Sequence, residues 1–310
     1  MRVVVTGALG HIGSRFIRSL PASFPGADVV LLDDFSTQRY PSLFDLPEGA
    51  RYRFVEADVL RADLGAIFAG ADAVVHLAAI TNAEASFDKQ AEVERVNFDG
   101  TERVAHACMR AGAGLVFLST TSVYGTQAGV VNETCSTEEL RPQSPYAESK
   151  LRAEQLIAQL GSEGLRSVTF RFGTIVGPSP GMRFHTAVNK FCWQAVLGEP
   201  LTVWRTALHQ RRPYLDLTDG VRAIEFVLAR GLDGSLYNVL TANASVAEIV
   251  AMIREVVPDV RVTEVDSRLM NQLSYEVSDA RFRARGFEPR GDLRRAIADT
   301  FAKLARLRRS

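Results

Sequence analysis

Tyr146 and Lys150 are the residues of this 310-residue chain whose types and spacing most directly suggest proton transfer. Residues four apart on a helix share one face, so the phenol and the ammonium group would be neighbours. A tyrosine hydroxyl normally titrates at about pH 10, and a nearby cation favours its phenolate form, which is a usable base near neutral pH. By itself the spacing Y-x-x-x-K is common and usually structural, so its meaning depends on the residues around it.

A second group of reactive side chains is the run Ser119-Thr120-Thr121-Ser122, which follows the apolar segment 114–118. The apolar segment predicts a buried strand, and open α/β sheets bind ligands beside the carboxyl ends of their strands. In isolation a solvated loop would be the favoured interpretation of four consecutive hydroxyl residues. Their combination with the tyrosine–lysine pair predicts a catalytic site.

Three glycines near the N-terminus predict an anion-binding turn. Gly7, Gly10 and Gly13 have the spacing G-x-x-G-x-x-G, after an apolar strand at 2–6 and before a predicted helix over 11–20, which we expect to end at the following proline. Glycine permits positive φ and close approach of a pyrophosphate to the backbone. The helix start offers free N–H groups and a positive dipole end. Strand, turn and helix in this order are the context that the motif requires; the alternative is a turn that needs its glycines only for packing.

Asp33 ends the second predicted strand, 28–32, twenty residues after the third glycine. A carboxylate there accepts the ribose hydroxyls of a dinucleotide and repels a 2′-phosphate, which favours NAD over NADP. Arg39 lies close in sequence and leaves NADP open, and an acidic strand end in water is the plainer alternative. Asp58 follows the third strand, 52–56, where it would accept from an adenine amino group or serve as an ordinary loop aspartate.

The alternation of strands and helices that would position these side chains continues through the first half of the chain. A fourth strand, 73–77, runs into small residues that would let a ribose-phosphate lie on the backbone. A helix over 92–110 carries Asn97 within its apolar stripe, and a buried amide needs partners. It would bind backbone or water near a catalytic centre, or bridge two elements. The remaining predictions are helices at 145–160 (capped by Ser144), 184–197, 246–256 and 293–307, a strand at 236–239 and an extended run at 201–204.

Composition excludes several function classes. The 36 basic and 36 acidic residues balance, which argues against binding to nucleic acid or a membrane surface. The three cysteines lack metal-ligand spacing, so we expect no metal site, no disulfide framework and a reducing cytoplasmic location. The chain begins directly on a strand and holds no apolar run of membrane-spanning length, so we expect neither a signal peptide nor a membrane anchor.

These features together resemble the extended short-chain dehydrogenase/reductase family, of the nucleotide-sugar epimerase/dehydratase type. The resemblance rests on the segments TGALGHIG, LLDDFST, ADV, HLAA, STTSVYG, PQSPYAESK, RFGTIVGP, RRPYLDLTD, LYNVLTANASVAEI and GFEPRGDLRRAI, which keep the family's order. It implies an α/β fold: a Rossmann-type doubly wound parallel sheet with a smaller, interleaved α+β substrate lobe. The NAD-binding domain would comprise 1–172 plus 213–239, and the substrate lobe 173–212 plus 240–310.

The resemblance also implies roles for single residues. Thr120, Tyr146 and Lys150 match the catalytic set. The residues that match cofactor-binding positions are Gly7, Gly10, His11, Ile12, Gly13, Asp33, Asp34, Ser36, Asp58, Val59, Leu77, Ala78, Ala79 and Asn97, together with Tyr146 and Lys150. Those expected to bind a nucleotide-diphosphate sugar are Thr121, Thr174, Arg183, Asn189, Trp204 and Arg212.

Departures from the family pattern narrow the expected chemistry. Thr121 and Ser122 stand where 4,6-dehydratases carry an acid–base pair, and Ser122 also stands where decarboxylases carry glutamate. Thr174 replaces an asparagine that contacts the substrate diphosphate, and Asp216 replaces a frequent histidine, so the usual UDP-sugar pose is in question.

The expected function is an NAD-dependent nucleotide-sugar epimerase, acting at C4 by transient hydride transfer to NAD. The alternatives are a reductase or dehydrogenase of a keto-deoxysugar nucleotide or another small ketone, and, more remotely, a non-catalytic NAD-sensing protein. The resemblance further implies a homodimer formed through the helices 92–110 and 145–160.

Overall fold

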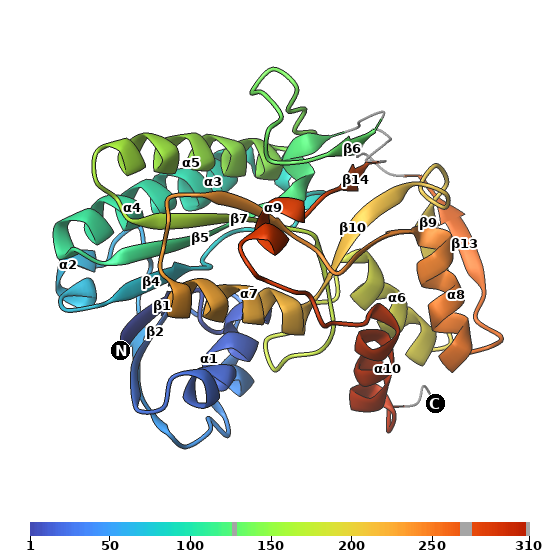
Figure 1. Cartoon of the computed structure of the whole chain (residues 1–310). Helices are drawn as coiled ribbons and strands as arrows, with labels where there is room; N and C mark the ends of the chain where they lie inside the picture. Colours follow the sequence, from blue (N-terminus) through green and yellow to red (C-terminus); the bar gives the residue numbers. More distant parts are fainter. Residues whose placement is uncertain (126–128, 267–274, 308–310) are drawn as a thin grey trace.

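A seven-stranded parallel sheet forms the centre of the protein in this computed structural model (Figure 1), which describes residues 1–125, 129–266 and 275–307. The strand order is β11-β7-β5-β4-β1-β2-β3, and every neighbouring pair is parallel. The strands are β1 (Arg2–Thr6), β2 (Ala27–Asp33), β3 (Ala50–Glu56), β4 (Ala73–His76), β5 (Gly114–Thr120), β7 (Ser167–Phe172) and β11 (Leu236–Val239). The predicted doubly wound fold is confirmed.

The order reverses between β1 and β4, since the chain first builds outward to β3 and then returns to the other side of β1. Open α/β sheets bind ligands in the crevice at such a switch point, beside the carboxyl ends of the strands. The glycine turn follows β1, and the hydroxyl run begins with the last two residues of β5, Ser119 and Thr120. Topology therefore brings these two sequence motifs to the same edge of the sheet.

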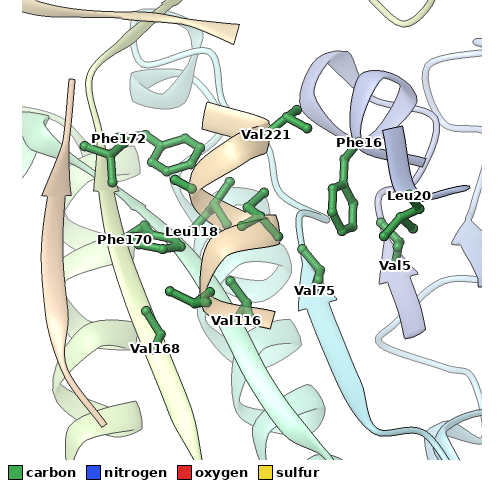
Figure 2. Close-up of a cluster of buried hydrophobic side chains, with 14 of the residues drawn as sticks. Val5, Phe16, Leu20, Val75, Val116, Leu118, Val168, Phe170, Phe172 and Val221 are labelled. Carbon is green, nitrogen blue, oxygen red and sulfur yellow. The ribbon is translucent and has the colours of Figure 1, made fainter. Parts of the chain in front are cut away.

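Side chains of each strand alternate between two buried layers, because successive residues of a strand point to opposite faces. Val3 and Val5 pack under the helices α1 (His11–Ser23) and α7 (Leu217–Arg230). Figure 2 shows part of this layer, in which Phe16 and Leu20 of α1 and Val221 of α7 lie over the sheet. On the other face, Val4 packs under the helices α2 (Leu64–Phe68), α4 (Gly100–Ala111) and α5 (Pro145–Ser162).

A smaller unit is built from later segments. Its three-stranded sheet has the order β12-β10-β8, in which β10 runs parallel to β8 and antiparallel to β12. The elements of this unit are β8 (Thr174–Val176), α6 (Ala187–Val196), β9 (Leu201–Trp204), β10 (Arg211–Asp216), β12 (Ala242–Ser245), α8 (Val246–Val256), β13 (Val262–Val265) and α10 (Leu293–Leu304). A separate hydrophobic cluster fills it. Outside it, β14 (Glu276–Val277) pairs with β6 (Val130–Val131), and α9 (Ala280–Ala284) packs on β11 through the buried Phe282.

Several predicted boundaries are wrong. Helix α1 continues past Pro21 to Ser23, because a proline in the last turn removes only one backbone bond while Phe16, Ile17 and Leu20 keep the helix packed on the sheet. Helix α6 begins at Ala187 rather than 184, and α10 ends at Leu304. Helix α7 is not among the predicted elements.

The predicted helix over 92–110 consists of three consecutive segments: α3 (Gln90–Glu94), a π-helical turn η3 (Arg95–Asp99) and α4. The π-helical turn contains the buried Asn97. A single turn of this kind widens the helix locally and commonly occurs at functional sites. The short 3₁₀ helices are η1 (Tyr40–Leu43), η2 (Ala85–Phe87) and η4 (Thr121–Tyr124).

None of the helices in the described part of the chain is long and apolar enough to cross a membrane. The same residues contain no cluster of three or more histidine, cysteine or acidic residues suited to a metal ion. Cys108, Cys135 and Cys192 are all free.

Two buried histidines predict a specific loss of stability in acid. Burial lowers the pKa of both His11 and His76 from 6.5 to about 3. Below about pH 6.5 the unfolded chain therefore binds protons that the folded chain does not, so stability is complete above that pH and falls as the pH drops toward 3. Each of these histidines contributes a loss of about 1.4 kcal/mol per pH unit in this window. The pKa of His185 is lowered too, to about 4, but its side chain is exposed and its share is smaller.

Urea unfolding between pH 7 and 5 measures this effect. His76→Gln should reduce the dependence of the unfolding free energy on pH by about a third to a half, whereas the same change at the exposed His106 should leave it as it was. A flat profile from pH 6 to 5 in the unchanged protein would contradict the prediction.

Candidate active site and cofactor site

The glycine turn connects β1 to α1, and its geometry requires glycine at two positions. Gly7 has φ +65°, and a Cβ there would lie 2.6 Å from the backbone nitrogen of Ala78. A Cβ on Gly13 would lie 2.6 Å from the carbonyl oxygens of Gly7 and Ala8. Gly10 is the N-cap of α1 and supplies no side-chain cap, and the first turn carries no acidic residue. The N-terminus of α1 is therefore a positive helix end without a protein carboxylate, which suits a phosphate.

Asp33 stands at the end of β2, beside this turn. Its Oδ2 accepts from the backbone nitrogen of Leu9 at 3.0 Å, and its Oδ1 accepts from that of Phe35 at 3.1 Å. Burial raises the pKa of Asp33, and these two N–H groups oppose the increase. The partly buried Arg39 interacts electrostatically with Asp33, and its Nη1 would lie 3.9 Å from a Cβ on Gly10. Carboxylate and guanidinium thus both border the turn.

The other predicted cofactor residues follow neighbouring strands. Asp34 is exposed and its Oδ1 accepts from the backbone nitrogen of Ser36 at 3.0 Å. Asp58 accepts from the backbone nitrogen of Leu60 at 2.9 Å, so it shapes the turn after β3, and Val59 is buried. The half-buried residues in this group are Ile12 in α1 and Leu77, Ala78 and Ala79 after β4.

Asn97 connects the segment after β4 to α5. Its Oδ1 accepts from the backbone nitrogen of Ile80 at 2.8 Å, and its Nδ2 donates to the Ile80 oxygen at 2.9 Å and to Ser149 Oγ at 3.2 Å. These bonds use both amide hydrogens. Asn97 therefore binds backbone and bridges two elements, so it positions Ile80 and α5.

The predicted catalytic residues come together at the end of β5 and the start of α5. Ser144 caps α5 by accepting from the backbone nitrogen of Ala147 at 3.2 Å, which places Tyr146 in the first turn and Lys150 in the next. Tyr146 is hydrogen-bonded to Thr120. The Lys150 ammonium lies 4.7 Å from the centre of the Phe117 ring in β5.

Arg183 is the charge that most affects Tyr146. Burial raises the pKa of the Tyr146 hydroxyl, whereas the Arg183 cation and the hydrogen bond to Thr120 lower it. The sequence predicts only Lys150 as an activating cation, and the structure adds this arginine. The pKa of Lys150 is lowered to about 7, because burial and, to a smaller extent, the Arg183 cation lower it more than the Glu154 carboxylate raises it. The phenol thus lies in a site where the Arg183 cation favours its ionised form.

The loop that carries Arg183 is hydrogen-bonded to the glycine turn and to α1. His11 Nε2 is bonded to the Gly177 oxygen at 2.8 Å, Ser179 Oγ donates to the His11 oxygen at 2.8 Å, and the Gly181 nitrogen donates to Ser14 Oγ at 2.9 Å. Arg183 approaches Tyr146 from this loop, and its buried Nε has no partner among the described residues. A guanidinium held in this way is available to an anionic ligand.

The other residues predicted to bind substrate lie in different parts of the structure. Asn189 is buried and its Nδ2 donates to the Arg183 oxygen at 3.2 Å. Thr121 donates to the Phe172 oxygen at 3.3 Å, and the half-buried Thr174 begins β8. The Arg212 guanidinium lies 5.5 Å from the Trp204 ring centre, so these two side chains lie together on β10 and β9 of the smaller unit.

Residues 3–239 match the sequence profile of the NAD dependent epimerase/dehydratase family. The chain belongs to this family. A UDP-glucose epimerase of Bacillus subtilis named YtcB, itself described as uncharacterized, is 32% identical over 83% of this chain and 82% of its own length. A dTDP-glucose 4,6-dehydratase of Streptomyces griseus is 33% identical over 97% of this chain and 93% of its own. The predicted family and fold are thereby confirmed, and the protein is an enzyme of this family.

Solved structures agree with this assignment. MoeE5 in complex with UDP-glucuronic acid and NAD has 30% identity and a TM-score of 0.84, and the similarity covers 99% of each chain. MoeE5 in complex with UDP-glucose and NAD has a TM-score of 0.85 at the same identity and coverage. The family is NAD-dependent, so the cofactor predicted from the glycine turn and Asp33 is confirmed.

The residues present fit NAD. The uncapped N-terminus of α1 would receive the pyrophosphate, and Asp33 would accept the ribose hydroxyls of the adenosine half. Lys150 would donate to the ribose on the nicotinamide side. When bound, NAD would supply a hydride acceptor.

Asp33→Ala should weaken NAD binding and reduce discrimination against NADP. The substitution removes both the ribose acceptor and the negative charge that repels a 2′-phosphate, while Arg39 remains beside the turn. Calorimetric titration with both cofactors measures the change, and Asp259→Ala is the matched control because that carboxylate is exposed and lies outside the predicted cofactor residues. Preference of the unchanged protein for NADP would contradict the role of Asp33 and would direct attention to Arg39.

Sequence reasoning did not give the structural roles of four residues near the site. The buried Tyr275 donates to Thr121 Oγ1 at 3.3 Å from a distant part of the chain. Glu154, one turn after Lys150 on α5, forms a buried pair with Arg171. Asp216, which replaces a frequent histidine, caps α7 by accepting from the Thr218 nitrogen at 2.8 Å. Only Glu154 had a sequence signal, since it lies four residues after Lys150 on one helix face.

Proposed function

We propose that this enzyme is an NAD-dependent C4 epimerase of a nucleotide sugar. The observation that carries the proposal is the catalytic set Thr120, Tyr146 and Lys150 next to Thr121 and Ser122, which are hydroxyl residues where dehydratases of this type carry an acid–base pair. Thr121 is 2% exposed and bonded to the Phe172 backbone and to Tyr275. A residue held in this way supplies neither an acid nor a base for removal of water.

Each catalytic side chain has a distinct part in the proposed reaction. Tyr146 takes the proton from the sugar hydroxyl at C4, and Thr120 holds that oxygen and passes the proton on. Lys150 orients the nicotinamide ribose, and its charge and that of Arg183 favour the Tyr146 phenolate. After the keto sugar turns over in the site, Tyr146 returns the proton to the oxygen at C4.

Substrate binding belongs to the same proposal. Arg183 lies next to Tyr146, and its Nε has no partner in the described part of the chain, so it would bind an anionic group of the substrate while Asn189 holds its backbone. Trp204 and Arg212, which contact each other, would bind the nucleotide at the far end. We further propose a homodimer in which α3, α4 and α5 of two copies pair, and a division into the two domains that the sequence predicts.

Product analysis tests the proposal. The NAD-loaded enzyme is incubated with UDP-glucose and with UDP-glucuronic acid, the ligands of MoeE5, and the products are followed by proton NMR and by absorbance of NADH. A C4 epimer without net NADH supports epimerisation. Net NADH would instead indicate a dehydrogenase or reductase.

Dehydration is the second candidate, because the Streptomyces griseus relative is a dehydratase. A dehydratase would convert UDP-glucose or dTDP-glucose into a 4-keto-6-deoxy sugar, which shows a new methyl doublet in the same spectra. That signal would overturn the epimerase proposal.

A further inference from the structure

A buried ion pair lies behind the catalytic side chains, outside the set that binds cofactor or substrate. Arg171 Nη2 donates to Glu154 Oε2 at 2.6 Å, and Arg171 Nε lies 3.1 Å from each Glu154 oxygen. Both side chains are 5% exposed. Ser119 Oγ also donates to Glu154 Oε1. The carboxylate is therefore fixed by three donors on two strands.

The pair touches every element that carries a catalytic residue. Glu154 lies one turn after Lys150 on α5. Ser119 directly precedes Thr120 in β5, and Arg171 is the register partner of Ser119 in β7. The Arg171 guanidinium also lies 4.8 Å from the Tyr124 ring centre, which restricts its position further. This cluster connects the middle of α5 to the ends of β5 and β7.

Stability alone is a poor reason for such a pair. Taking two charges out of water costs several kcal/mol, and well-packed apolar residues of similar volume are often as stable or more so. A buried charged group can have an effect that an apolar group cannot have: across a medium of low dielectric constant, its electric field changes the energy of a neighbouring charge.

That neighbouring charge is Lys150, and the groups around it have opposing effects. Glu154 on α5 favours the protonated ammonium, whereas Arg183 on the loop before α6 disfavours it. His76 on β4 is buried and neutral, because burial and the Lys150 charge both lower its pKa. Phe117 on β5 contributes only its ring face, and Tyr146 lies one turn earlier on α5. Glu154 is thus the buried anion that opposes the loss of the Lys150 proton.

We propose that Glu154, held in place by Arg171 and Ser119, is a positioning residue that increases the protonated fraction of Lys150 inside a site that otherwise favours the neutral amine. This rests on the role given to Lys150 under the proposed function. Without the Glu154 charge, only a small fraction of Lys150 would be protonated at neutral pH, and its attraction for the Tyr146 phenolate would be weaker.

The Lys150 titration can be observed directly because the chain has only four lysines, at positions 89, 150, 190 and 303. Protein labelled with ¹³C at lysine Cε gives four resonances, and Lys150→Arg identifies one of them. We expect its midpoint, the Lys150 pKa, to lie at about 7 in the unchanged protein. In E154Q it should fall by about one pH unit or more, the usual effect of a nearby opposite charge.

E154Q leaves Arg171 buried and unpaired, so the fold itself is at risk. The double variant E154Q/R171Q removes both charges, keeps the shapes and should fold, and its Lys150 midpoint should also fall. S119A is the matched control: it removes a hydrogen bond to Glu154 but no charge, so the midpoint should stay within about 0.3 pH units.

An unchanged Lys150 midpoint in a folded E154Q/R171Q protein would overturn the proposal. Failure of that double variant to fold would also overturn it, in favour of a purely structural pair. The measurement uses no sugar substrate, so its result is independent of whether the enzyme proves to be an epimerase. In the active enzyme the same shift should move the alkaline limb of the kcat profile to lower pH.

Discussion

Replacing Tyr146 with phenylalanine should lower turnover by about 10²–10⁴, the range for losing a positioned proton-transfer group. The change removes one oxygen and keeps the ring, so packing beside Thr120 should hardly alter. The predicted cofactor residues Gly7, Gly10 and Asp33 are separate from the phenol. NAD affinity should therefore change by less than about threefold. Steady-state kinetics and calorimetric titration with NAD measure the two quantities.

The matched control is Tyr237→Phe, which removes a hydroxyl bonded to Asp233 at 2.6 Å in β11, the edge strand of the sheet. Turnover of this variant should be unchanged. Equal losses in the two variants would show that the hydroxyl of Tyr146 has no special part in the reaction. A loss of NAD binding as large as the loss of turnover would move Tyr146 from proton transfer to cofactor binding.

Gly181→Ala should strongly weaken NAD binding, although Gly181 lies outside the set of catalytic side chains. A Cβ on Gly181 would lie 2.1 Å from the Leu9 oxygen and 2.5 Å from the Gly10 oxygen, so backbone must move on one side or the other. Either the loop that carries Arg183 leaves the glycine turn or the turn itself shifts. Such overpacking costs about 1–3 kcal/mol. If the strain falls on the cofactor-bound state, NAD affinity drops by about tenfold or more.

Gly161→Ala is the control for this prediction. Gly161 lies near the end of α5, and a Cβ added there would meet no atom within 4 Å, so alanine should be neutral or slightly stabilising. NAD affinity and the thermal midpoint measured on both variants separate a local clash from a general effect of the added methyl group. Unchanged NAD affinity in Gly181→Ala would show that the loop and the turn are not mechanically coupled.

Local sequence patterns were sufficient to predict the parallel sheet and the residues that lie at the carboxyl ends of its strands. Apolar runs of strand length, a glycine turn before a helix and an acidic residue after the second strand each predict structure from a few neighbouring residues. Ser144 and Pro145 marked the start of α5 in the same way, which is why Tyr146 and Lys150 could be placed on one face.

Boundaries and the smaller unit were less predictable. The sequence contains Pro21, and local rules end a helix there, but burial of Phe16 and Leu20 against the sheet outweighs one lost hydrogen bond. The strands β8, β10 and β12 are short segments from distant parts of the chain. Tyr214 of β10 pairs with Thr174 on one side and with Ala242 on the other, and no local pattern marks such pairing.

The sequence by itself determined which cofactor turn, which acidic ribose site and which proton-transfer residues we predict for this protein, because those features depend on spacing within single segments. Only the tertiary structure decided which charges surround Tyr146 and Lys150. Arg183 lies on a loop that is hydrogen-bonded to α1. Glu154 lies on α5, and its orientation is fixed by Arg171 on β7 and Ser119 on β5. Electrostatic interaction depends on distance through space and on burial, and neither quantity can be obtained from positions along a chain.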